Sequence, residues 1–251
     1  MKTTHIYIAG LLLASLAAPC MAQDDPNDLS DKRRLTFGAR IQAYPLKMFK
    51  TSVQTTNVVK PATDTTYTGS TESPKVGFGP TLEFRLTNHI SVGAEGIFHR
   101  IQYKEVKEIR DGATPASGAT DSRRVATFTE TTRANTWEVP ILARYYGFRE
   151  RGIFSRLYAA GGISFRRTTN IRTGNEISNF DTTTDYNEKP ATPSKPNQMG
   201  GVVGFGIRFI DNIGIRIAPE VRYTRWQGYN FSGTSYKAVQ QDIQGGISVS
   251  F

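Results

Sequence analysis

The sequence predicts an all-β protein, namely an eight-stranded antiparallel up-and-down transmembrane β-barrel with short periplasmic turns and long external loops. Three observations predict this fold. They are an export leader at the N-terminus, eight segments in which apolar and polar residues alternate, and a strict alternation of short and long connections. We expect three parts: a signal peptide over residues 1–22, a polar segment over 23–34, and the barrel over 35–251.

The leader has the three regions of a secretory signal. Lys2 gives a positive start, residues 6–18 form an uncharged and mostly apolar run, and Ala22 ends a small-residue cleavage site. The apolar run is shorter than the roughly 20 residues that span a bilayer. A buried N-terminal helix and a lipoprotein acylated at Cys20 are the alternatives, and Pro19 argues against the second. We expect cleavage after Ala22, which leaves a mature protein that starts at Gln23.

Composition narrows the class of protein further. The chain has 251 residues and a low hydrophobic content of 38%, but its 11% of aromatic residues and its many β-branched residues argue against a disordered chain. Its only cysteine lies in the leader, so the mature protein has no disulfide, no thiolate nucleophile and no cysteine metal site. The net charge of +9 suits nucleic acid, acidic polysaccharide or anionic lipid. Export disfavours nucleic acid as a partner.

Eight segments show the period-two alternation of half-buried strands. In the first of them, for example, Phe37 and Ile41 alternate with Arg40 and Gln42. The eight predicted strands are Leu35–Ala43, Val76–Leu86, Ile90–Phe98, Thr136–Tyr145, Leu157–Phe165, Gly201–Phe209, Ile213–Tyr223 and Val239–Phe251.

The connections between these segments alternate in length. Residues 87–89, 147–156 and 210–212 make the short ones, and polar stretches over 49–74, 106–124, 167–197 and 227–236 make the long ones. Transmembrane barrels have this asymmetry, with tight periplasmic turns and long external loops. A soluble β-sandwich with eight alternating strands does not require it.

Charged residues lie opposite the apolar face of the strands. In a soluble sandwich or barrel these charges would face water, whereas in a membrane barrel they line the lumen. The leader, the loop asymmetry and the terminal Phe251 favour the membrane. We therefore predict a charge network that fills the lumen, with Glu138 and Glu220 as central acceptors, because eight strands leave an interior just filled by side chains. The predicted network is Glu83, Arg85, Glu95, Glu138, Arg144, Arg208, Arg216, Glu220 and Arg222.

Three segments resemble a known family. Residues 137–146 (WEVPILARYY) look like a mid-barrel strand of small outer-membrane β-barrel domains, the family with OmpA/OmpX-like and PorT-like barrels. Residues 157–162 (LYAAGG) resemble its next strand, and residues 247–251 (ISVSF) are similar to the terminal strand that barrel-assembly machinery reads. The resemblance spans about residues 35–251. It implies a fold and a Gram-negative outer-membrane location, but no single activity.

The sequence shows no catalytic, cofactor-binding or metal site. His5 leaves with the leader and His89 falls in a tight turn. His99 is expected to point inward near the external rim, but Ser91 lies too deep to complete a Ser–His–acid set with it. Gly204 and Gly206 precede no helix, so they do not form a phosphate loop. A group of arginines flanks strand ends, where lipid phosphates or lipopolysaccharide are possible ligands and solvated charge is the alternative: Arg123, Arg124, Arg149, Arg151, Arg166, Arg167 and Arg172.

These observations predict a non-enzymatic, monomeric outer-membrane barrel that contacts external partners through its long loops. Its expected partners are outer-membrane lipid, lipopolysaccharide and the barrel-assembly machinery, the last through Phe251. A small-solute, porin-like pore and an outer-membrane lipid-modifying enzyme are the rival functions. The width of the barrel interior distinguishes a pore from a non-conducting barrel, because eight strands leave no open channel. A change in lipid composition after substitution of His99 would indicate the lipid-modifying enzyme.

Overall fold

The computed structural model describes residues 34–46, 48–58, 63–71, 73–111, 125–147, 153–179, 182–186, 195–211, 213–232 and 235–251. The predicted signal peptide, and residues 23–33 of the polar segment, lie outside this range. No helix among the described residues is long and apolar enough to cross a membrane.

Strands make up most of the described chain, with one 3₁₀ turn at Ile153–Ser155. The strands are β1 (Leu35–Ala43), β2 (Phe49–Thr51), β3 (Val53–Val58), β4 (Thr63–Thr71), β5 (Val76–Arg85), β6 (Ile90–Glu95), β7 (Ile97–Asp111), β8 (Val125–Tyr146), β9 (Leu157–Asn179), β10 (Thr182–Tyr186), β11 (Asn197–Ile207), β12 (Phe209–Ile210), β13 (Arg216–Trp226), β14 (Tyr236–Ala238) and β15 (Gln241–Ser250).

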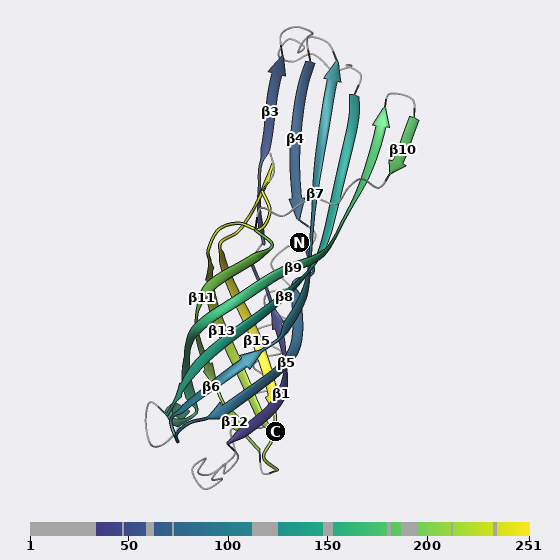
Figure 1. Ribbon diagram of the computed structural model, residues 1–251. Coiled ribbons are helices and arrows are strands. Elements are labelled where there is room, and N and C mark those ends of the chain that lie inside the picture. Colours follow the sequence, from purple (N-terminus) through teal and green to yellow (C-terminus); the bar gives the residue numbers. More distant parts are fainter. Residues whose placement is uncertain are drawn as a thin grey trace.

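Eight strand positions pair antiparallel in a ring, which we call the ring (Figure 1). Its order is β1, β5, β6 with β7, β8, β9, β11, β13 and β15, and β15 pairs back onto β1. β6 and β7 count as one position because their register against β8 continues across Gly96: Ala94 pairs with Ile141, and Ile97 with Glu138. All eight predicted strands therefore appear in the ring, each paired with the next along the chain.

The outer face of the ring is apolar and its inner face is polar, which is the reverse of a soluble protein. Along β8, Glu138, Leu142 and Arg144 are buried inside, while Trp137 and Ile141 are exposed outside. The same alternation runs through β1, β5, β6, β11 and β15. Large exposed apolar side chains thus cover the outer face, and charged and polar side chains fill the interior. This is the arrangement expected where lipid, not water, surrounds the strands.

Two predicted strands begin later than expected. The seventh starts at Arg216 instead of Ile213, because the Asp211 carboxylate accepts hydrogen bonds from the backbone N–H groups of Ile213 and Ile215 and holds residues 213–215 in a turn. Gly214 supplies the positive φ of 87° that this turn needs. The eighth starts at Gln241 instead of Val239, whose N–H bonds to the Met48 carbonyl.

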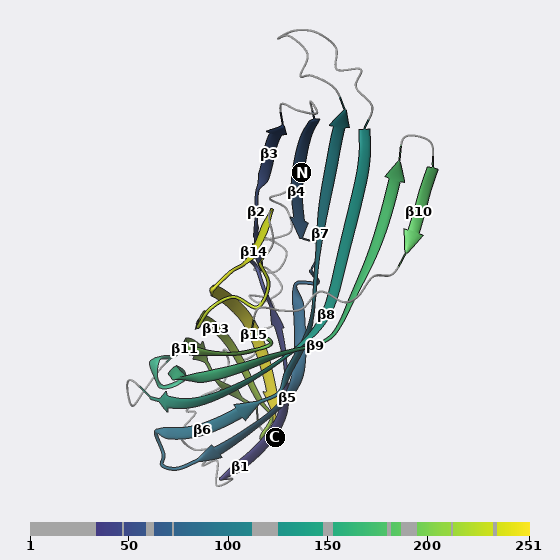
Figure 2. The same cartoon turned by 45° about the horizontal axis from the view of Figure 1, so that its top comes forward.

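The prediction of loops is wrong over much of the described length of three long connections, 49–74, 106–124 and 167–197, whereas in 227–236 a strand begins only at Tyr236. β7, β8 and β9 continue past the ring, β4 pairs with β7, β3 with β4, and β10 with β9. These parts form one sheet, the extension, in the order β3–β4–β7–β8–β9–β10 (Figures 1 and 2). Its strands are rich in threonine, which favours extended backbone, but they lack an apolar face and so carry no period-two signal.

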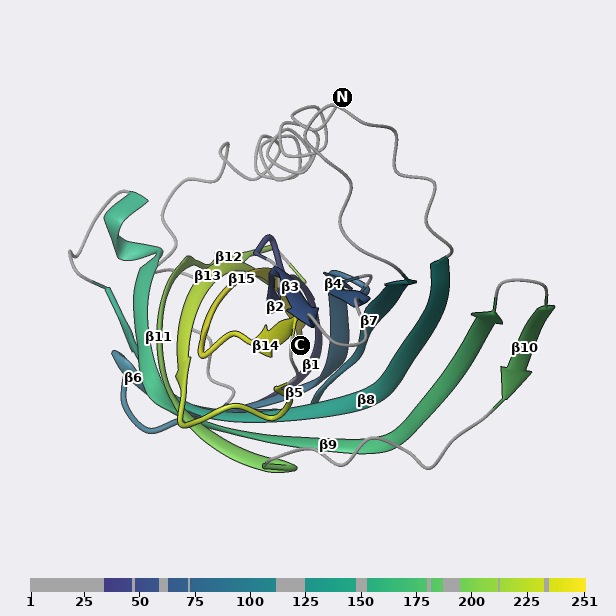
Figure 3. The ribbon, with the colours of Figure 1, turned by 90° about the horizontal axis from the view of Figure 1, so that it is seen from above.

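An apolar cluster lies where the extension meets the ring. β2 pairs with β14, and viewed from above this small sheet lies within the outline of the ring (Figure 3). We call the cluster the aromatic cap. It comprises Phe49, Ile101, Tyr103, Ala134, Phe231, Tyr236 and Ala238.

Polar contacts fix the cap to the extension. The Tyr236 hydroxyl donates to the Tyr103 hydroxyl at 3.1 Å, and Glu105 accepts hydrogen bonds from the backbone and hydroxyl of Ser235 at 2.9 and 2.7 Å. Burial raises the pKa of the Tyr236 phenol, which keeps that hydroxyl a neutral donor. The cap therefore places a layer of buried apolar side chains at this end of the ring.

Candidate functional site

Six ionic side chains from five strands meet inside the ring near its middle, and we call them the lower cluster. They are Arg40 of β1, Glu83 of β5, Glu95 of β6, Arg144 of β8, and Glu220 and Arg222 of β13. Three arginines face three glutamates, so the cluster is balanced in charge. Such balance is needed because an unpaired charge in this setting costs several kcal/mol.

Glu95 and Arg222 join opposite sides of the ring. Both Nη groups of Arg222 donate to the Glu95 carboxylate at 2.6 Å, in a bidentate pair. β6 and β13 stand at the third and seventh of the eight positions in the ring order. Arg144 adds a 2.6 Å bond to the same carboxylate and a 2.9 Å bond to Glu83. The pair therefore crosses the interior.

Glu220 is the second acceptor of the lower cluster. It receives Arg222 Nε, the Tyr158 hydroxyl at 2.8 Å and Arg40 Nη1 at 3.4 Å. Arg40 and Arg222 are 0% and 1% exposed, and Glu220 is 3% exposed. Every ionic group at this level thus has a partner of opposite charge.

The other predicted network residues at this end lie nearer the short turns. Arg85 donates to the backbone carbonyls of Thr87 and Asn88 in the exposed turn after β5. Arg208 lies over the Tyr146 ring, with its guanidinium carbon 4.0 Å from the ring centroid. Arg216 Nη1 donates to the Thr36 hydroxyl at 3.0 Å. None of these contacts joins them to the acceptors of the lower cluster.

A second group, the upper cluster, centres on Glu138 and lies between the lower cluster and the aromatic cap. The Glu138 carboxylate is 2% exposed and accepts hydrogen bonds from Arg166, Gln244 at 3.2 Å and Tyr44 at 3.4 Å, and contacts His99 Nε2 at 3.0 Å. β8 and β15, which carry Glu138 and Gln244, also stand opposite each other in the ring order. The interior is therefore bridged at two levels.

Arg166 connects the upper cluster to a further carboxylate. Its Nη2 group lies 3.2 Å from Asp242, and its guanidinium carbon lies 3.8 Å from the centroid of the Trp226 ring. The expectation that Arg166 flanks a strand end and meets lipid phosphates is wrong. Phe165 points outward, so period two turns Arg166 inward, where Glu138 and Asp242 neutralise it.

The remaining arginines of the strand-end group fall in two places. Arg167 and Arg172 are exposed on β9. Arg123, Arg124, Arg149 and Arg151 lie outside the described residues.

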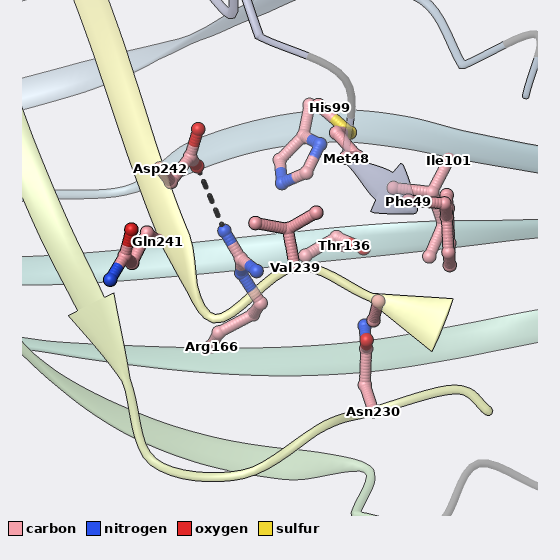
Figure 4. Close-up of a pocket in the computed structure, with 11 residues that line it drawn as sticks. Met48, Phe49, His99, Ile101, Thr136, Arg166, Asn230, Val239, Gln241 and Asp242 are labelled. Carbon is pink, nitrogen blue, oxygen red and sulfur yellow. Dashed lines mark hydrogen bonds and ion pairs between the residues drawn. The ribbon is translucent and has the colours of Figure 1, made fainter. Parts of the chain in front are cut away.

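A small cavity lies beside the upper cluster, and its lining includes His99, Thr136, Arg166, Asp242 and Phe49 (Figure 4). It has room for about one or two water molecules. His99 Nδ1 and Thr136 Oγ1 are buried and have no hydrogen-bond partner. Ordered water satisfies such groups in protein interiors. The cavity is too small for an organic cofactor.

The buried His99–Glu138 contact has the polarity of an acid–base pair, but His99 makes no hydrogen bond to a serine or threonine hydroxyl among the described residues. Ser91, the serine on the same face, lies eight residues away along the continuous strand, which is about 26 Å at the rise of a β-strand. His99 is 2% exposed and does not face the outer, apolar surface. No group of three or more described His, Asp, Glu or Cys residues is arranged to hold a metal ion.

Four acidic or basic side chains of the two clusters were missing from the sequence-predicted network: Arg40, His99, Arg166 and Asp242. Each lies on the polar face of its strand by simple alternation, so period two contains the signal that could have found them. Their pairing partners come from other strands and were not readable from one strand alone.

No curated protein sequence matches this chain. The sequence model of one family, described as an outer membrane protein beta-barrel domain, matches residues 21–225. That range includes seven of the eight ring positions. Together with the ring of antiparallel strands and its apolar outer face, this match covers most of the chain. The protein therefore belongs to the outer membrane protein beta-barrel domain family.

Proposed function

We propose that this protein is a closed, non-conducting, up-and-down barrel of the outer membrane that holds the extension outside the cell as an interaction surface. The signal peptide directs its export, the short turns face the periplasm, and the role is structural rather than enzymatic. One observation carries the proposal: the ring is apolar outside and charged inside, while the extension is polar on both faces. Only the ring is therefore suited to lipid.

The extension supports the interaction role. β7, β8 and β9 run without interruption from the ring into the extension, so the sheet is a rigid continuation of the membrane anchor. Two short strands lengthen the sheet at its edges, β3 on one side and β10 on the other. A large, flat, polar sheet held away from the bilayer offers a surface for macromolecules.

The interior contacts disfavour the rival function of a small-solute pore. Two levels of cross-ring ion pairs and hydrogen bonds, Glu95–Arg222 and Glu138–Gln244, lie below the aromatic cap. A solute passing through would have to break buried charge pairs, and each broken pair costs about 3–5 kcal/mol. The rival function of a lipid-modifying enzyme is disfavoured because His99 makes no hydrogen bond to a serine or threonine hydroxyl among the described residues.

Labelling of single cysteines in intact cells tests the proposal. Thr68→Cys places an exposed thiol on β4 of the extension, and Asn88→Cys places an exposed thiol in the short turn between β5 and β6. The mature chain is expected to have no other cysteine. A membrane-impermeant maleimide should label the first variant in intact cells and the second only after the outer membrane is permeabilised.

The reverse labelling pattern would invert the orientation. Equal labelling of both variants in a soluble periplasmic fraction would reject the membrane assignment. A heat-modifiable band in detergent gels, which a closed and hydrogen-bonded barrel produces, serves as the control for folding in both variants.

A further inference from the structure

Three arginines form a contiguous patch on the outer face of the extension, at its base. They are Arg100 of β7, Arg133 of β8 and Arg172 of β9, which we call the arginine patch. All three are exposed. Arg133 and Arg172 are direct cross-strand partners. Arg100 lies diagonally to Arg133, because its own partner is Asn135. The three guanidinium groups therefore lie on adjacent strands of one surface.

A β-bulge creates this juxtaposition. The β8–β9 register shifts between Arg133 and Asn135, and Asn170 on β9 adopts a positive φ of 50°. Below the bulge, Arg166 and Thr168 point inward; above it, Thr173 points inward and Arg172 outward. The extra residue switches the phase of the strand and re-aims a side chain, which is a common use of bulges at functional sites. Without it, Arg172 would point to the inner face.

The arginine patch breaks a local rule of sheet stability. Like charges directly opposite each other on neighbouring strands are destabilising. No carboxylate of the described residues lies within ion-pair distance of Arg133 or Arg172. Their Nε groups instead donate to neutral amides, Arg133 to Gln102 at 3.2 Å and Arg172 to Asn170 at 3.3 Å. These bonds orient both guanidinium groups while leaving their charge uncompensated. Such a conflict is expected where a ligand supplies the missing charge.

The position of the arginine patch indicates which kind of ligand it binds. Phe98 and Trp137 point outward and pack at a centroid distance of 5.1 Å, and Phe78 extends this row at 5.9 Å from Phe98. Aromatic rows of this kind mark the boundary of the hydrocarbon layer. Arg100 is the next outward residue after Phe98, so the patch begins at the level of the lipid headgroups. Arg167, the direct partner of Trp137, adds a further exposed cation at the boundary.

We propose that the arginine patch is a binding site for the phosphate groups of lipid A in the outer leaflet. This inference rests on the proposed function, because only an external extension brings the patch to that leaflet. Arginine suits the ligand, since its planar guanidinium forms bidentate bonds to phosphate. Two opposed guanidinium groups clamp one phosphate between them, and the phosphate removes the repulsion between Arg133 and Arg172. Charge complementarity thus selects a phosphorylated glycolipid.

The test compares folded stability in vesicles of defined composition. Wild-type protein and the Arg133→Gln/Arg172→Gln variant are refolded into phosphatidylcholine vesicles, alone or with phosphorylated lipid A, dephosphorylated lipid A or phosphatidylglycerol. The temperature at which the heat-modifiable band disappears reports the stability. The matched control is Lys50→Gln/Lys237→Gln, because these two lysines are also exposed cross-strand partners but lie on the β2–β14 pair, where Lys237 is 4.0 Å from the Tyr229 ring.

We expect the order of stability of wild type and the arginine variant to reverse when lipid A is added. In phosphatidylcholine alone the arginine variant should be as stable as wild type or more stable, because a repulsion has been removed. With phosphorylated lipid A, wild type and the lysine control should gain stability, and the arginine variant should need about tenfold more lipid A or more for the same gain. Arg133→Lys/Arg172→Lys should fall between them, since lysine keeps the charge without the bidentate geometry.

The opposite results separate the two proposals. Three results would overturn the lipid A site while leaving the membrane barrel intact. Wild type could gain as much stability from dephosphorylated lipid A, it could gain as much from phosphatidylglycerol, or the arginine variant could respond to lipid A like wild type. Failure of wild type to give a heat-modifiable band in any vesicle would instead overturn the proposed function.

Discussion

Glu138 shows how a single side chain organises the interior. It is almost fully buried, yet its two oxygens have contacts with Arg166, His99, Gln244 and Tyr44. A buried carboxylate is tolerated only when charged partners and hydrogen bonds replace its lost hydration. Removing it leaves the Arg166 guanidinium with Asp242 as its one carboxylate partner among the described residues.

Glu138→Ala should destabilise the folded protein by about 3–5 kcal/mol, the usual effect of leaving one member of a buried pair without its partner. The free energy of unfolding, measured by urea titration in vesicles, gives the value. Glu108→Gln is the matched control: Glu108 pairs with Arg110 at 3.2 Å, but both side chains are more than a third exposed, so the loss there should stay below about 1 kcal/mol. Equal losses in the two variants would contradict a buried, paired Glu138.

Among the elements, β5 approaches the β6–β7 position too closely for a side chain at Gly79. A Cβ there would lie 1.8 Å from the Gly96 carbonyl oxygen, which is backbone and has little freedom to move. Pro80 and Gly96 also share a hydrogen bond, from the Gly96 N–H to the Pro80 carbonyl at 3.0 Å. Glycine at position 79 therefore permits the close packing of two ring strands.

Gly79→Ala should destabilise the protein by about 1–3 kcal/mol or more, because overpacking forces the backbones of the two strands apart. Gly201→Ala is the control, since a Cβ at that position meets no atom within 4 Å. Thermal loss of the heat-modifiable band compares the two variants. If both alanines were equally harmless, the packing of β5 against Gly96 would have to be looser than described.

The last strand gives a second prediction at this scale. Phe251 exchanges two backbone hydrogen bonds with Phe37, at 2.9 and 3.2 Å, at the end of the β15–β1 pair that completes the ring. Its side chain is 63% exposed. We propose that the barrel-assembly machinery reads this terminus, so deleting Phe251 should prevent insertion in cells and leave the protein as a protease substrate in the periplasm.

Fractionation and heat-modifiability of the outer-membrane fraction measure that outcome. Phe251→Tyr keeps the backbone pair and the aromatic side chain, and it should insert normally. Refolding of the deletion variant in detergent should still succeed, because the exposed side chain adds little to the stability of the ring. Normal insertion of the deletion variant in cells would show that the C-terminus has no role in assembly.

For the whole molecule, the cross-ring contacts predict an absence of ion conduction. Refolded wild-type protein in a planar lipid bilayer should give no steady channel, because Glu95–Arg222 and Glu138–Gln244 span the interior and the aromatic cap covers one end. A heat-modifiable band from the same preparation controls for folding. A large, steady conductance would require an interior wider than eight strands provide and would favour the pore.

The sequence by itself determined the ring. All eight positions, the inward direction of residues such as Glu95 and Arg222, and the outward direction of Trp137 follow from period two. This works because alternation is a local property of the backbone, and because lipid and lumen impose opposite polarity on successive residues. The family match agrees with this reading.

The tertiary structure alone decided the rest. Whether Arg222 meets Glu95 or Glu138 depends on the stagger between strands across the ring, which no single strand encodes. The extension escaped prediction because both of its faces are polar, so its threonine-rich strands do not alternate between apolar and polar residues. Arg166 and Arg172 looked alike in the sequence. One points to a buried carboxylate and the other to the surface because a single bulged residue at Asn170 lies between them.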